Sequence, residues 1–296
     1  MIGACTIWGL SPLYYKMLSH VPPLEVLAHR TLWSLVFFGL VLAVQGRLRT
    51  LAGAIGTPRR LGVVLAAALA ISTNWFLFIR SIATGHAVQA SLGYYIFPLA
   101  AVLIGVVLFG ERLGRWQALA VGLAALAVAW LAWGLGAPPW ISLALAASFA
   151  AYGAIKRFAQ AGPVVSVTAE VLLLSPLALG WLGHLALKGT AQADPAAGDL
   201  WLLVVSGPLT GAPLILFSYA ARRVRLATLG LLQYLNPTLQ FLVATLIFRE
   251  AFSTDHAVAF GLIWLALAVY SADSRSRARA ARSASTVAAA SGTTDR

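Results

Sequence analysis

Ionisable side chains inside long apolar stretches are the first candidates for function, because charges are costly there and commonly functional. Glu170 stands within the apolar run 164–185, and Glu25 lies at the start of the run 24–44. His29 follows Glu25 by one helical turn, so the two side chains share a face if this run is helical. We expect Glu25, His29 and Glu170 to couple solute movement to protons or to gate access to a central site. A structural role for Glu25 at the beginning of a helix is the alternative.

The sequence does not contain the residue patterns of an enzyme, a metal site or a nucleotide site. Its histidines are scattered without metal-ligand spacing, and neither a Gly-x-Ser-x-Gly elbow nor a glycine-rich phosphate loop occurs. The single cysteine, Cys5, excludes an internal disulfide. We therefore expect no catalytic residues, no metal and no cofactor, and any energy for work must come from a gradient or a partner.

A second group of residues combines flat apolar rings or amides with hydrogen-bonding tips, a chemistry that suits an amphipathic or aromatic solute. We expect these residues to line a cavity for a small organic solute: Trp8, Tyr14, Asn74, Trp75, Tyr94, Tyr95, Gln233 and Tyr234. Hydrogen bonds between helices are the alternative for the amides. Core packing or a place in the membrane interface is the alternative for the aromatic residues.

One sequence pattern occurs twice. The segment 90–93 leads to Pro98 and Glu111, and the segment 227–230 leads to Pro237 and Glu250, with the acid 13 residues after the proline in both copies. Proline removes a backbone donor and displaces the carbonyl four residues earlier. We expect local breaks or kinks at Gly93 with Pro98 and at Gly230 with Pro237, facing one cavity, and structural ion pairs for the two acids. Ordinary helix packing is the alternative for the prolines and glycines.

Composition places the chain in the membrane. Apolar residues make up 60% of it, charged residues only 10%, and the mean hydropathy is +0.84. Runs long enough to cross a bilayer predict about ten transmembrane helices: 2–18, 24–44, 61–82, 88–109, 115–133, 139–157, 164–185, 200–220, 227–248 and 255–273. The predicted fold is therefore an all-α polytopic membrane protein surrounded by lipid.

The positions of the charges predict the orientation. The formal net charge is +12, and most basic residues fall in alternate connections and the C-terminal tail. Because basic loops stay inside, we expect both termini in the cytoplasm and no role in nucleic-acid binding. An odd number of spans in each half makes the repeats antiparallel. We thus predict inverted five-helix repeats at 1–135 and 136–273 around a central cavity, and a disordered basic tail at 274–296.

Several segments together resemble EamA-type members of the drug/metabolite transporter superfamily: Ile7-Trp8-Gly9, Glu25 with 29–34, Asn74-Trp75, 90–94, Gly110-Glu111-Arg112, 228–230, Gln233-Tyr234 and 237–239. The resemblance implies ten helices in two inverted repeats and alternating access around a central cavity. It also implies export of small metabolites or drugs across the bacterial inner membrane. A passive channel or a non-transporting membrane scaffold is the alternative.

Overall fold

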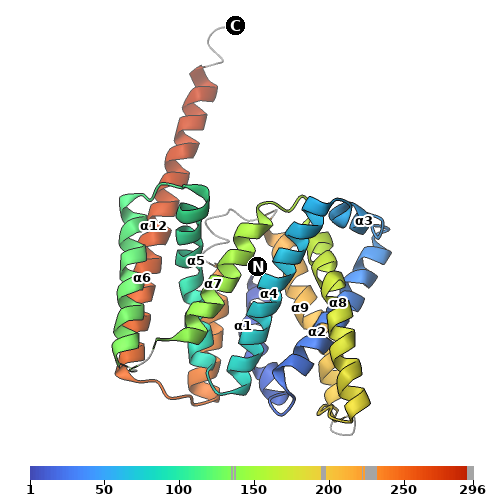
Figure 1. Cartoon of the computed structure of the whole chain (residues 1–296). Coiled ribbons are helices and arrows are strands. Elements are labelled where there is room, and N and C mark those ends of the chain that lie inside the picture. The colour runs from blue at the N-terminus through green and yellow to red at the C-terminus, as the bar shows by residue number, and fades with distance from the viewer. Residues whose placement is uncertain (135, 137, 195–197, 222, 224–231, 292–296) are drawn as a thin grey trace.

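The computed structural model describes residues 1–291 except 135, 137, 195–197, 222 and 224–231 (Figure 1). Every regular element in these residues is helical. The elements are α1 Ile2–Met17, α2 Pro23–Val44, α3 Thr50–Ile55, α4 Pro58–Ala83, α5 Ala87–Phe109, α6 Arg115–Gly134, α7 Trp140–Lys156, α8 Pro163–Lys188, α9 Asp199–Ala221, α11 Leu235–Leu242, the π-helix η1 Val243–Ile247 and α12 Thr254–Ser291.

Seven of the described helices are long and apolar enough to cross a membrane: α2, α4, α5, α6, α8, α9 and the first part of α12. The shorter helices α1 and α7, and the segment formed by α11 and η1, occupy three further predicted apolar runs. The sequence did not predict α3, which lies in the connection between α2 and α4. The protein is thus a multi-pass membrane protein whose described elements are all helical.

Proline and glycine mark several helix ends. Pro23, Pro58 and Pro163 occupy the first turn of α2, α4 and α8, where a missing N–H has no helical acceptor to lose. Gly110 and Gly189 end α5 and α8 with φ values of 64° and 62°, a left-handed conformation that glycine adopts without strain. Proline thus marks the start of three long helices, and glycine follows the end of two.

An acid from the far half of the chain caps α5. The Glu250 carboxylate accepts hydrogen bonds from the backbone N–H groups of Ala87 and Val88, both at 2.8 Å. Glu111, its counterpart in the repeated pattern, instead pairs with exposed Arg157 at 2.7 Å. The expected ion pair therefore forms at Glu111, whereas at Glu250 the negative charge stabilises a helix N-terminus.

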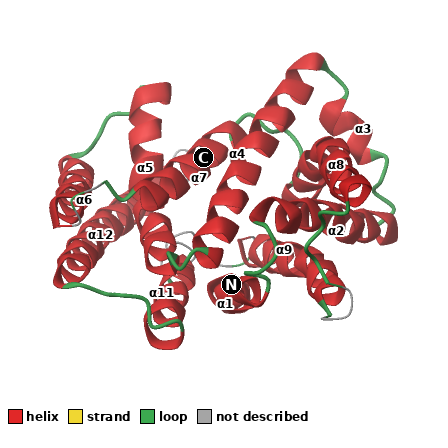
Figure 2. Ribbon diagram, turned by 60° about the horizontal axis from the view of Figure 1, so that its bottom comes forward, coloured by secondary structure: helices red, strands yellow, loops and turns green. Residues whose placement is uncertain are grey.

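The helices pack in pairs that join the two halves of the chain. α5 lies against α7, α6 against α12, and α2 against both α8 and α9. α11 contacts both α1 and α5, as Figure 2 shows. Large apolar side chains on the outside, such as Trp133 on α6 and Trp201 on α9, are 90% and 77% exposed. Such rings on the rim of a membrane protein suit the boundary between headgroups and lipid chains.

Gly93 allows a close approach of α5 to α7. A Cβ atom at this position would lie 2.8 Å from the Ser142 carbonyl oxygen and 3.0 Å from the Leu145 Cβ. α5 continues as one helix through Gly93 and Pro98, so the expected break is wrong, while the kink stays a prediction. Neighbouring helices can stabilise a proline-containing helix in a membrane. Pro237 lies in the first turn of α11, directly after a turn at Tyr234, and Gly230 lies outside the described residues.

The C-terminal segment departs from its predicted disorder. We expected an unstructured tail from Ser274, but the backbone of α12 continues as a helix to Ser291. The segment is rich in alanine and arginine, both strong helix formers, and it follows directly from a packed helix. Composition without apolar periodicity therefore failed to predict a helix that propagates from a neighbouring span. Residues 292–296 lie outside the described residues.

Candidate functional site

A cavity of about 310 Å³ lies between the two halves of the chain. Helices α1, α2, α4, α5, α7, α8, α9 and α11 each contribute lining residues, and Gln233 contributes from the segment just before α11. The volume falls at the lower end of the range of small-molecule sites. Most of the surface is apolar or aromatic, with a few polar groups among the rings. This is the composition expected for a site that binds a small organic molecule.

Five of the eight residues that the sequence predicted for a solute cavity lie together in its wall: Trp8, Asn74, Trp75, Tyr94 and Gln233. The other three lie elsewhere. The Tyr14 hydroxyl donates a hydrogen bond to the Leu202 carbonyl, which ties α1 to α9. Tyr95 and Tyr234 line a separate pocket beside α12, where the Tyr95 hydroxyl lies 2.6 Å from Thr238 Oγ1.

Asn74 joins three helices at the cavity wall. Its side-chain amide donates to the Leu145 carbonyl and to Ser148 Oγ, both at 3.0 Å, and its side-chain oxygen accepts from the Tyr94 hydroxyl at 3.0 Å. The residue is 1% exposed. These bonds connect α4 with α7 and α5, so the interhelical role is the one that the structure shows. Tyr94 in turn packs against Phe78 and Phe149, with ring centres 5.8 and 5.9 Å apart.

Arg30 is a cationic side chain in the cavity wall that sequence reasoning did not select. It lies on α2, two turns from the helix start, and is 7% exposed. Its Nε donates to Thr210 Oγ1 at 3.0 Å, and its guanidinium lies 4.1 Å from the ring centre of Trp75 and 5.6 Å from that of Tyr15. An arginine inside an apolar run is itself a signal of function, and it could have identified this residue.

Glu170 belongs to a buried polar cluster between α7 and α8. Its carboxylate pairs with Lys156 Nζ at 2.5 Å and accepts hydrogen bonds from Ser166 at 3.0 Å and Tyr152 at 3.1 Å. Lys156 also donates to Ser166. Lys156 and Tyr152 line the cavity, while Glu170 lies behind them with 1% exposure. Lys156 was not singled out from the sequence, where it counted only among the basic residues that predict the orientation, so this contact was missed.

Glu25 and His29 lie away from the cavity wall. The Glu25 carboxylate accepts hydrogen bonds from the backbone N–H groups of Gln192 and Ala193, both at 3.1 Å. These bonds attach the start of α2 to the connection between α8 and α9. His29 is partly buried one turn further along α2. The contacts of Glu25 are therefore those of a structural residue at a helix start.

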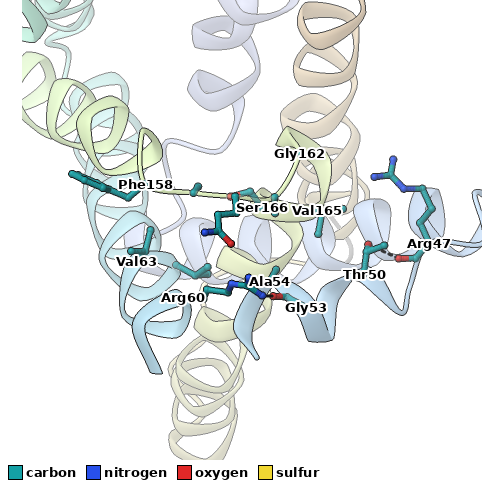
Figure 3. A pocket seen from close by; sticks show the side chains of 14 residues that line it. Arg47, Thr50, Gly53, Ala54, Arg60, Val63, Phe158, Gly162, Val165 and Ser166 are labelled. Carbon is teal, nitrogen blue, oxygen red and sulfur yellow. Dashed lines mark hydrogen bonds between the residues drawn. The ribbon is translucent and has the colours of Figure 1, made fainter. Parts of the chain in front are cut away.

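A further pocket lies at the end of the molecule that carries α3, between α3, α4 and the connection from α7 to α8 (Figure 3). Arg60 donates from Nη1 to the Gly53 carbonyl at 2.9 Å, and Thr50 donates to the Arg47 carbonyl at 2.6 Å. Ser166 lies in its wall and also contacts the Lys156–Glu170 pair. The start of α8 thus contributes to both spaces, because Val165 and Ser166 line this pocket whereas Pro163 and Val167 line the central cavity.

Within the described part of the chain, no three His, Cys, Asp or Glu side chains gather in a way that could hold a metal ion. Ion pairs, hydrogen bonds and ring contacts thus account for the polar chemistry described for the central cavity. Such groups can bind a solute and release it, and they can change partners as helices move.

Comparisons with known proteins find a matching family model and several similar proteins. The family model described as "EamA-like transporter family" matches residues 1–133. The chain is 44% identical to "Protein RarD" of Streptomyces exfoliatus, over 97% of this chain and 93% of that protein. It is 41% identical to an "Uncharacterized transporter" of Vibrio cholerae, over 96% and 94% of the two chains. It is 37% identical to "Protein RarD" of Escherichia coli strain K12, over 92% of each.

A solved structure named only "Crystal structure of protein" has the same fold, with a TM-score of 0.59 and 21% identity over 90% of this chain and 94% of that chain. The similarity to the RarD proteins extends over nearly all of the sequence, well beyond the residues that the family model matches. The chain therefore belongs to the EamA-like transporter family, among relatives that carry the name RarD.

Proposed function

We propose that this protein is a secondary transporter that moves small organic metabolites or drugs across the bacterial inner membrane by alternating access. The observation that carries the proposal is the central cavity, whose wall is shared by helices from both halves of the chain. A site at the interface of two repeats can be exposed first to one side and then to the other when the repeats rock against each other. Saturable exchange of solutes is the expected activity.

The pattern of helix contacts supports two inverted repeats, at residues 1–135 and 136–273. Chain order pairs α1, α2, α4, α5 and α6 with α7, α8, α9, α11 and α12. Under this pairing the contact of α5 with α7 matches that of α1 with α11, and the contact of α4 with α7 matches that of α1 with α9. α2 with α8, α5 with α11 and α6 with α12 are contacts between counterparts. Such a pattern is expected of two repeats that are related by an internal two-fold axis.

The basic connections support an orientation with both termini in the cytoplasm. Connections 45–57, 110–114 and 157–162 lie at the same end of the molecule as the last turns of α12 (Figure 1). Arg47, Arg60, Arg112 and Arg157 lie in or next to these connections, and positive charge marks the cytoplasmic side. The cavity wall reaches Lys156 and Pro163 at this end. We infer that the described conformation presents its site toward the cytoplasm, as export requires.

Glu170 is the residue that we propose for coupling to protons. Its carboxylate is buried and holds Lys156, which faces the cavity, so protonation would release that lysine toward the solute. Glu25 and His29 lie outside the cavity wall, near the start of α2, where Glu25 holds the connection between α8 and α9. We propose a gating role for this pair, through the position of that connection.

The test begins with purified protein in detergent and a thermal-shift screen of aromatic amino acids, nucleosides and phenicol drugs, because a ligand that binds the folded state raises its stability. Each compound that stabilises the protein is then measured as a radiolabelled solute in proteoliposomes. Saturable uptake that is accelerated by the same solute on the other side supports a carrier. Non-saturable flux indicates a channel, and neither stabilisation nor flux indicates a scaffold.

Two matched variants locate the site. Trp75→Ala removes a ring from the cavity wall, and Trp130→Ala removes a ring that is 48% exposed on the outer surface of α6. We expect exchange to be lost in the first variant and retained in the second. Equal effects of the two substitutions would show that the cavity is not the transport site.

A further inference from the structure

Arg30 carries a positive charge that the described part of the protein does not neutralise. Of the five N–H donors of a guanidinium, only Nε has a hydrogen-bond partner within these residues, at Thr210. The ion pairs found in them join His20 to Asp199, Lys156 to Glu170 and Arg157 to Glu111, and none includes Arg30. The side chain is nevertheless more than nine-tenths buried, in the wall of the cavity.

The corresponding position in the second half is occupied by an acid. Arg30 follows Pro23, in the first turn of α2, by seven residues, and Glu170 follows Pro163, in the first turn of α8, by the same interval. Glu170 has its countercharge within the protein, on Lys156. Since that pair is neutral, Arg30 leaves the cavity with a net positive charge. Both cations line the wall, and the described lining residues include no acid.

Rings hold the guanidinium in place without satisfying its donors. Trp75 and Tyr15 lie within cation–π distance, which lowers the cost of burying the charge but leaves the N–H groups available. Thr210 fixes the orientation through Nε. A planar guanidinium with two free nitrogens binds a carboxylate through two parallel hydrogen bonds. A preorganised site for such a group therefore exists in the cavity.

We propose that the transported solute is an organic carboxylate with an apolar or aromatic body, and that Arg30 binds its carboxylate. This inference rests on the proposed transport function. Trp75, Phe78 and Phe149 supply flat apolar surface for the body of the solute. A phosphate ester is a poorer fit, because it carries a second negative charge. The other cation in the wall, Lys156, is already paired with Glu170 and so does not offer a free positive charge to it. The carboxylate of the solute thus supplies the negative charge that pairs with Arg30.

The experiment compares acids with neutral molecules of nearly the same shape. Benzoate and benzamide, and 3-phenylpropionate and 3-phenylpropanamide, are titrated into purified protein, with thermal stability as the measure of binding. We expect the acids to bind more tightly than the amides by about tenfold or more, as loss of a buried charged contact implies. Equal binding of acids and amides, or no binding of either acid, would overturn the proposal.

Variants of Arg30 assign the preference to this residue. Arg30→Gln should remove the preference for acids, and Arg30→Lys should retain part of it, since lysine keeps the charge but not the two-pronged geometry. Arg80→Gln is the control, because Arg80 is exposed near the far end of α4. If Arg30→Gln does not fold, the Arg30→Lys variant decides: an unchanged preference contradicts the proposal.

Flux measurements separate this inference from the transport function itself. Acid-selective binding that depends on Arg30, without any exchange in proteoliposomes, would leave the site standing and overturn the transporter. Saturable exchange of an amide with no preference for the acid would leave the transporter standing and overturn the anion site. Arg30-dependent exchange of the acid supports both.

Discussion

The two acids of the repeated pattern allow one substitution to be compared in two environments. Glu250 accepts two backbone N–H groups at the start of α5, at 2.8 Å each, whereas Glu111 forms one ion pair in which its side chain is 50% exposed. Glu250→Gln keeps one oxygen acceptor but loses the negative charge and one of the two bonds. A hydrogen bond to a charged group contributes about 1.5–3 kcal/mol and loss of a cap about 0.5–2 kcal/mol.

We therefore expect Glu250→Gln to lower the free energy of unfolding by about 2 kcal/mol, and Glu111→Gln by less than about 1 kcal/mol, as for exposed ion pairs. Unfolding of the purified proteins in mixed detergent micelles, followed by tryptophan fluorescence, measures both values. Raising the salt concentration should weaken only the contribution of Glu111, because exposed pairs are screened. A larger loss in Glu111→Gln than in Glu250→Gln would refute the reasoning.

Three further substitutions test the packing around the cavity. Gly93→Ala should reduce the yield of folded protein, because its Cβ would lie 2.8 Å from a carbonyl oxygen of α7. Gly122→Ala is the control and should not reduce the yield, because the space around Gly122 is open. The yield of protein that stays folded in detergent measures both effects. Lys156→Met should destabilise the protein by about 3 kcal/mol by leaving buried Glu170 unpaired, and addition of Glu170→Gln should restore part of the loss in a double-mutant cycle of unfolding free energies. Asn74→Ala should cost about 1–2 kcal/mol in the same assay, since membrane hydrogen bonds average about 0.6 kcal/mol each; no loss would show that its three bonds are not formed.

Much of the helical architecture could be predicted because lipid imposes a simple rule on sequence. A span must be helical and apolar over a fixed length, so helix positions follow from composition alone. The sequence also carries a signal for the starts of α2, α4 and α8, since each of these helices begins at a proline. α3 and the continuation of α12 to Ser291 obey no such rule, because they lie outside the apolar runs.

The rotation of each helix was the part of the site that sequence could not supply. Tyr94 and Tyr95 are neighbours on α5, and adjacent helical residues point about 100° apart. Both have the chemistry of a cavity residue, yet only Tyr94 lines the cavity, while Tyr95 faces Thr238 and Trp264. α5 is apolar on all sides, so its sequence carries no amphipathic signal to choose between them. Tertiary packing made the choice.

The spacing of the exposed tryptophans near the two ends of α6 indicates the thickness of the bilayer that the protein fits. Trp116 and Trp133 are 46% and 90% exposed, and they stand 17 residues apart on one uninterrupted helix. At the rise of an α-helix this separation is about 25 Å, slightly less than the hydrocarbon thickness of about 30 Å in a typical membrane. Both rings can then reach the headgroups of opposite leaflets only if α6 stands nearly upright or the surrounding lipid thins. Bilayers of short-chain lipids should accordingly match this protein better than bilayers of long-chain lipids.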